Sequence, residues 1–200
     1  MRGFSIYAVI LITLIIMIRY IVLLVRKEIK PALAMWLFFS VAIIMCLITY
    51  RSEGSYGLLD NIMNTVDLIY GVTVCIAILL FGDRSSKFTG FDRSCLAAVM
   101  IIALFWIFTR NHWLTNILMQ AVLVIAYFPV VKRLLDSKEN TEPFSVWIGM
   151  LIAPIFALLS SKGILATIYS VRAIICVSLL LLLMLRMELL KMKSRQAERS

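Results

Sequence analysis

The stretch that decides the fold is residues 164–186, ILATIYSVRAIICVSLLLLLMLR, in which Arg172 is the one charge before the final arginine. About 20 mostly apolar residues are enough for a helix to cross the hydrocarbon core of a bilayer. Backbone groups in hydrocarbon must be satisfied within the segment, which favours a helix. Six similar stretches precede it. Together they predict an all-α membrane protein with seven transmembrane helices, at about 4–25, 32–50, 61–82, 94–109, 113–131, 144–161 and 164–186.

The composition supports this prediction. Hydrophobic residues make up 62% of the 200 residues and charged residues 16%, and the mean hydropathy is +0.99. Such a chain has too little polar surface for a soluble globule. We therefore expect a multi-pass protein of the plasma membrane or an inner membrane.

Lysine and arginine residues are distributed unevenly between the gaps. The gaps after the first, third and fifth spans and the C-terminal tail hold 14 of them, whereas the other side holds 4. The positive-inside rule places the richer side in the cytoplasm, with the N-terminus outside and the C-terminus inside. This bias and contact with anionic lipid headgroups account for the net charge of +9, so no nucleic-acid partner is expected.

An internal repeat is also visible. Residues 18–26, IRYIVLLVR, align with residues 125–133, IAYFPVVKR, through Tyr20 and Tyr127. In both places a basic loop, a proline and a tryptophan follow in the same order. The alignment predicts a triple-helix repeat at 1–82, a linker helix at 83–111, a second triple-helix repeat at 112–190 and a basic cytoplasmic tail at 191–200. A single linker helix makes the two repeats parallel, as in one class of transporters, although any two apolar stretches align to some degree.

The second repeat carries a family resemblance. Residues 120–159, with Gln120, Ala126-Tyr127-Phe128-Pro129 and Pro143-Phe144-Ser145-Val146-Trp147, resemble a PQ-loop repeat. The layout of three, one and three helices resembles the SWEET sugar transporters, and vitamin transporters of the nicotinamide-riboside type share it. The chain departs from the pattern at Pro129-Val130, where the family has Pro-Gln, and at Val22, where a proline is expected.

The resemblance implies a divergent member that carries a small polar solute, of the sugar or vitamin class, by alternating access between two triple-helix bundles. In that family, asparagines of the third and seventh spans contact the sugar. Carried over by position, these contacts fall on Asn64 and on Ser170, which is not an asparagine.

The third span carries the most informative polar stripe. Asp60, Asn64, Asp67 and Gly71 are spaced to share one helical face. A carboxylate near mid-membrane costs about 2.5–3.5 kcal/mol on insertion scales, so Asp67 should face the bundle interior, a partner or water. Arg172 lies at a similar depth in the seventh span and is the expected partner. The pair either lines a solute path or joins two halves of a static bundle.

The fifth span adds a second stripe, Asn116, Gln120 and Tyr127, which suits either a path or hydrogen bonding between helices. Pro129 and Pro154 lie within spans, where a proline removes a helical hydrogen bond and allows bending, so both are predicted hinges. The full set of predicted path residues is Asn64, Asp67, Gln120, Tyr127, Ser170 and Arg172.

Catalytic and metal-binding signatures are missing from the sequence. It contains no glycine-rich phosphate loop or nucleophile elbow, and its four cysteines lack CxxC spacing while His112 stands alone. We therefore expect neither an enzyme nor a metal or cofactor. The alternative to a transporter is a membrane scaffold, chaperone or regulator in which Asp67 and Arg172 form a structural pair. Self-association is left open.

Overall fold

The structure, a computed structural model, describes residues 1–29, 31, 33–82, 90–137 and 142–197. Every regular element in these ranges is a helix, which confirms the predicted all-α class. The elements are α1 (Arg2–Val25), α2 (Leu33–Glu53), the 3-10 helix η1 (Leu58–Asn61), α3 (Ile62–Phe81), α4 (Gly90–Thr109), α5 (His112–Ile125), α6 (Phe128–Ser137), α7 (Phe144–Leu158) and α8 (Ile164–Ala197).

Five of the seven predicted spans are long and apolar enough to cross a membrane. They lie in α1, in α2, in η1 with α3, in α5 with α6, and in α8. The two remaining apolar helices, Arg93–Thr109 and Phe144–Leu158, are shorter. This difference follows from the sequence, because the fourth and sixth apolar stretches were already the shortest of the set.

Asparagine side chains set two helix starts. Asn61 accepts a hydrogen bond from the backbone N–H of Asn64 at 3.3 Å, and Asn111 accepts one from the N–H of Leu114 at 2.9 Å. Each satisfies an N–H group that has no partner within the first helical turn. These caps fix where α3 and α5 begin, and so fix the register of the polar residues that follow.

Two predicted boundaries differ from the structure. The fifth span, expected to be continuous over 113–131, is interrupted by a turn at Ala126 and Tyr127, and α6 begins at Phe128. A proline fits best in the first turn of a helix, so Pro129 favours a new helix start here. The expected tail at 191–200 is partly helical, because α8 continues to Ala197 through good helix formers such as glutamate, leucine, lysine and methionine.

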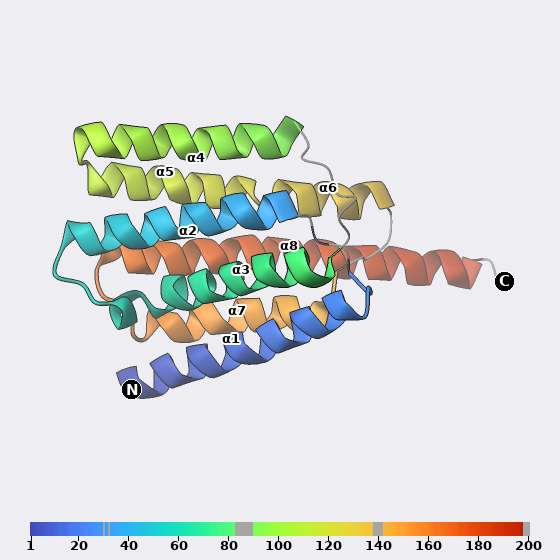
Figure 1. The fold of residues 1–200 in the computed structure, drawn as a ribbon. Coiled ribbons are helices and arrows are strands. Elements are labelled where there is room, and N and C mark those ends of the chain that lie inside the picture. Colours follow the sequence, from blue (N-terminus) through green and yellow to red (C-terminus); the bar gives the residue numbers. More distant parts are fainter. Residues whose placement is uncertain (30, 32, 83–89, 138–141, 198–200) are drawn as a thin grey trace.

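The long helices lie side by side in one bundle, with the two termini at opposite ends (Figure 1). Helices α1, α3, α5 and α8 run away from the end that holds the N-terminus, and α2, α4 and α7 run back toward it. The C-terminal part of α8 extends beyond the bundle. An odd number of passes through the bundle explains why the termini lie apart.

The packing order is the same in two groups of helices. Helix α3 contacts both α1 and α2, and α8 contacts both α5 and α7. The groups meet where α1 packs on α7, α2 packs on α5, and α3 contacts α8. Helix α4 lies outside this arrangement, against α2 and α5.

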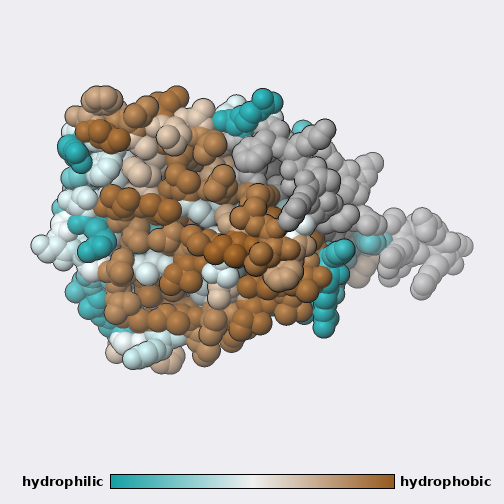
Figure 2. Space-filling view, viewed as in Figure 1, coloured by the Kyte–Doolittle hydropathy of each residue, from teal (hydrophilic) through white to brown (hydrophobic). Residues whose placement is uncertain are grey.

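The surface between the two ends of the bundle is strongly apolar. Figure 2 shows a hydrophobic band across the middle of the visible face, with hydrophilic residues gathered toward both ends. Large apolar side chains are exposed on the surface of the molecule; Leu80, Ile101 and Leu179, for example, are each more than 60% exposed. Soluble monomers rarely expose apolar patches beyond a few hundred square ångströms. Together with the five long apolar helices, this surface indicates a membrane protein.

Close contact between α1 and α7 depends on Gly149. A Cβ atom at this position would overlap with Cγ2 of Ile16, a branched side chain buried in the core. We therefore expect Gly149→Ala to lower the free energy of unfolding by about 1–3 kcal/mol, the usual cost of overpacking. The same change at Gly3, where nothing lies within 4 Å of the added atom, is the matched control. Denaturation of the purified protein in detergent measures both; equal effects at the two glycines would contradict the predicted packing.

Candidate solute site at the centre of the bundle

Asp67 and Arg172 are both buried, with relative exposures of 8% each, but they make no direct ion pair in the described part of the chain. The expected direct pairing is thus corrected. Tyr169 of α8 connects them, because its hydroxyl donates to Asp67 Oδ2 at 2.9 Å. Its ring centroid lies 4.8 Å from Cζ of Arg172, so the guanidinium stacks over the ring. Residues three apart on a helix share a face, which brings Tyr169 and Arg172 together.

The Arg172 guanidinium is held from a second side by α5. Its Nε donates to Gln120 Oε1 at 2.7 Å. The Gln120 amide in turn donates to Asn116 Oδ1 at 3.3 Å and faces Sγ of Cys46 at 3.7 Å. Arg172 therefore has a fixed orientation, between an aromatic ring and an amide oxygen.

Asn116 extends these contacts to α2. Its Nδ2 donates to the carbonyl oxygen of Cys46 at 2.8 Å and to Oγ1 of Thr49 at 3.0 Å. The chain of contacts thus crosses from α3 through α8 and α5 to α2, and joins both packing groups. We call Asp67, Tyr169, Arg172, Gln120 and Asn116 the central network.

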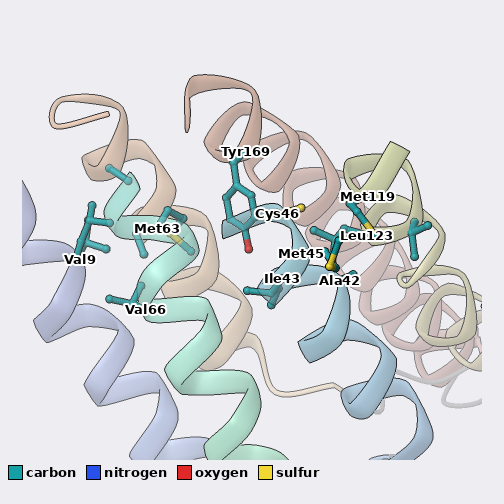
Figure 3. Packing of buried hydrophobic residues seen from close by; sticks show 14 of the residues in the cluster. Val9, Ala42, Ile43, Met45, Cys46, Met63, Val66, Met119, Leu123 and Tyr169 are labelled. Carbon is teal, nitrogen blue, oxygen red and sulfur yellow. The ribbon is translucent and has the colours of Figure 1, made fainter. Parts of the chain in front are cut away.

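The surroundings of the central network are apolar. Tyr169 belongs to the largest buried cluster, with Cys46, Ile43, Met119 and Leu123 among its members. Figure 3 shows Tyr169 between the α3 side and the α2 side of this cluster, with its hydroxyl oxygen pointing inward. Charges in such surroundings interact strongly because little solvent screens them.

One donor of Arg172 is left over. Its Nη1 is buried and has no hydrogen-bond partner among the described residues. A buried polar group without a partner costs about 1–3 kcal/mol, and more when it is charged. The bundle retains this cost at its centre.

Other predicted path residues lie outside the central network. The Asn64 amide is buried against the backbone of α2, where its nitrogen fits the carbonyl of Ile43 at 3.2 Å and its oxygen fits the N–H of Leu47 at 3.2 Å. Ser170 is fully buried on α8 without a hydrogen-bond partner among the described residues. Because it comes two residues before Arg172, it points to a different side of α8.

Tyr127 takes an intermediate position. Its ring centroid lies 6.1 Å from that of Trp147, and the ring borders a small cluster that includes Val130 and Leu134. The Tyr127 side chain also lies within electrostatic reach of Arg172. It sits at the turn between α5 and α6, where the predicted span is interrupted.

The two predicted hinges occupy different local structures. Pro129 follows the turn that separates α5 from α6. Pro154 is buried in the interior of α7, where it leaves the carbonyl of Met150 without its usual helical donor. The structure thus offers one broken helix and one weakened helix, both in the second packing group.

A separate polar cluster lies at the end of the bundle that holds the N-terminus. The Asp60 carboxylate is bonded to Arg2 of α1, to Lys162 at 3.1 Å and to the N–H of Gly57 at 2.8 Å. The carbonyl of Lys162 accepts from the Tyr50 hydroxyl at 2.8 Å. We call Arg2, Asp60 and Lys162 the N-terminal latch. Asp60 thus joins α1, η1 and the loop before α8.

The sequence missed Tyr169, Thr49 and Cys46. Tyr169 carried a usable signal, since it lies three residues before a buried arginine. Thr49 and Cys46 carried none, because small residues on an apolar helix also suit ordinary packing. Comparisons with known proteins find no family model, no curated protein and no solved structure that matches this chain. The SWEET resemblance therefore stays a prediction from sequence motifs.

Proposed function

We propose that this chain is a multi-pass carrier of the plasma or inner membrane that moves a small polar solute by alternating access, without nucleotide hydrolysis. The observation that carries the proposal is the central network, a buried cation and a buried carboxylate placed where two groups of helices meet. Ionisable groups inside membrane bundles are costly, and they commonly mark solute or ion pathways.

The packing order supports two parallel triple-helix bundles with α4 as the linker. In each group the third helix contacts the other two: α3 with α1 and α2, α8 with α5 and α7. The first helix of each group packs on the second helix of the other group: α1 packs on α7, and α5 packs on α2. This exchange is what a two-fold axis along the membrane normal produces, and carriers built from parallel repeats hold solute at such an interface.

Matching aromatic pairs support the same arrangement. Tyr20 and Trp36 pack with ring centroids 5.4 Å apart, and Tyr127 and Trp147 with centroids 6.1 Å apart. These four residues are the ones that the sequence alignment of the two repeats superimposes. The two ring contacts are similar, whereas the indole N–H groups differ: that of Trp36 donates to the Tyr20 hydroxyl at 3.2 Å and that of Trp147 donates to Glu142 at 3.0 Å.

A static scaffold is the competing hypothesis, and the tight contacts of Arg172 with Gln120 and of Asp67 with Tyr169 favour it. A chain that only joins or positions other membrane components needs no solute path. In that case the central network would serve to fix the packing of α2, α3, α5 and α8.

Uptake by proteoliposomes separates the two functions. The purified protein would be screened with radiolabelled sugars, amino acids, vitamins and small organic acids. We expect flux of at least one class, and we expect Arg172→Gln and Asp67→Asn each to reduce it more than about tenfold, since a lost charge-assisted hydrogen bond changes binding by that factor or more. Ile175→Ala, on the exposed side of α8, is the matched control and should keep full flux.

Protein recovered in folded form but without flux of any class would overturn the proposal and favour the scaffold. Size-exclusion profiles of each variant show whether a lost flux reflects the path or a failure to fold. Flux that persists in both folded variants would exclude the central network from the path.

A further inference from the structure

Arg172 points to a specific chemical class of solute. We infer that the central network binds a carboxylate group, so that the carried solute is a small monocarboxylic acid and not a neutral sugar. This inference rests on the proposed function. Its basis is the buried Nη1 of Arg172, which has no partner among the described residues although the side chain is only 8% exposed.

The guanidinium is already oriented for such a ligand. Gln120 binds its Nε at 2.7 Å, and the Tyr169 ring supports its face. The remaining N–H donor of this cation binds a charged carboxylate oxygen more strongly than it binds a neutral oxygen. A guanidinium held on two sides loses little further freedom when the acid arrives.

A neutral sugar finds few partners in the same place. Its hydroxyl groups need side chains that both donate and accept, such as amides. The amide of Asn116 is bonded to Cys46 and Thr49, that of Gln120 is bonded to Arg172 and Asn116, and that of Asn64 fits the backbone of α2. These amides are already bonded within the protein, whereas Nη1 of Arg172 has no partner among the described residues.

Asp67 narrows the class further. Its Oδ2 accepts the Tyr169 hydroxyl at 2.9 Å, and the guanidinium lies over the face of the same tyrosine ring. A ligand with a second negative charge would be repelled by this carboxylate in apolar surroundings. The arrangement therefore favours one carboxylate per solute over two.

Matched acids and amides test the inference on the unmodified protein. Thermal denaturation in detergent would be followed with lactate against lactamide, nicotinate against nicotinamide, and succinate as the dicarboxylate. We expect at least one monocarboxylate to stabilise the protein in a saturable manner. Its amide should bind about tenfold to hundredfold more weakly, because the charged hydrogen bond is lost.

Two variants locate the effect. Arg172→Gln should abolish the difference between acid and amide, and Arg172→Lys should restore part of it, because lysine keeps the positive charge without the planar guanidinium that Gln120 and Tyr169 orient. Ile175→Ala should behave as the unmodified protein. Equal binding of acids and amides, or a preference for acids that survives in folded Arg172→Gln, would overturn the inference.

The failure of this inference is distinct from failure of the proposed function. Flux of a neutral sugar or amide that depends on Arg172, without flux of any acid, would refute the carboxylate and retain the carrier. Absence of flux for every solute, with no stabilisation by any of these probes, would refute both.

Discussion

Asp67→Asn and Arg172→Gln are each expected to lower the free energy of unfolding by about 3 kcal/mol, the lower end of the range for breaking a buried charge pair. We take the lower end because Tyr169 separates the two groups and shares their interaction. Each single change leaves one buried charge without its counterpart. Denaturation of the purified variants in detergent measures the loss.

The double variant is the informative one. With both charges removed, no uncompensated charge remains in the apolar cluster around Tyr169. The loss in Asp67→Asn/Arg172→Gln should therefore be smaller than the sum of the single losses, by about 1–3 kcal/mol. Such a coupling energy shows that the two residues act as one unit across α3 and α8.

A second double-mutant cycle, between Asp60 and Arg172, provides the matched control. Asp60 also carries a carboxylate and belongs to the same polar stripe as Asp67, but it is bonded to Arg2 and Lys162 in the N-terminal latch. Positions 60 and 67 are seven residues apart, which corresponds to about 10 Å along a helix axis. Asp60→Asn and Arg172→Gln should be additive within about 0.5 kcal/mol. If the losses in free energy of unfolding from Asp67→Asn and Arg172→Gln were also additive, the central network would not be a coupled unit.

The buried polar stripe could be predicted from the sequence, because helical spacing fixes which residues share a face. Asp60, Asn64, Asp67 and Gly71 are all buried, as their common face requires. The same reasoning placed Asp67 and Arg172 inside the bundle. Membrane insertion makes this step reliable, because an exposed charge at that depth would be costly.

The contacts of those residues could not be predicted in the same way. Helical spacing places Tyr169 on the same face as Arg172, but it does not show that the tyrosine hydroxyl donates to Asp67 on another helix. The partners of Asn64 are backbone atoms of Ile43 and Leu47, which have no signature in side-chain patterns. Spacing along one helix shows which way a residue faces, but not which atom of the next helix it meets.

Helix ends were a second limit. Hydropathy does not register a turn such as Ala126–Tyr127, since both residues are compatible with a continuous apolar span. The proline at 129 was visible, yet a proline suits a kink as well as a new helix start. The C-terminal end of α8 was missed because charged residues signal the membrane boundary but do not stop a helix.

Thiol labelling of Cys46 tests most directly whether the centre of the bundle opens to water. Cys46 lies beside Gln120 and is fully buried, so only a conformational change can expose it. The variant Cys75→Ala/Cys95→Ala/Cys176→Ala keeps it as the single cysteine of the chain. A small charged methanethiosulfonate that does not cross lipid would be added from one side of sealed proteoliposomes at a time.

We expect modification from the side opposite the N-terminal latch, because ion pairs of Asp60 with Arg2 and Lys162 join α1, η1 and the loop before α8 at the other end. A transported solute should slow this modification, and Asp60→Asn should increase modification from the latch side. Cys46 of the folded protein could instead stay unmodified from both sides, with and without Asp60→Asn. The centre of the bundle would then never become accessible to water, and the account of a carrier would be contradicted.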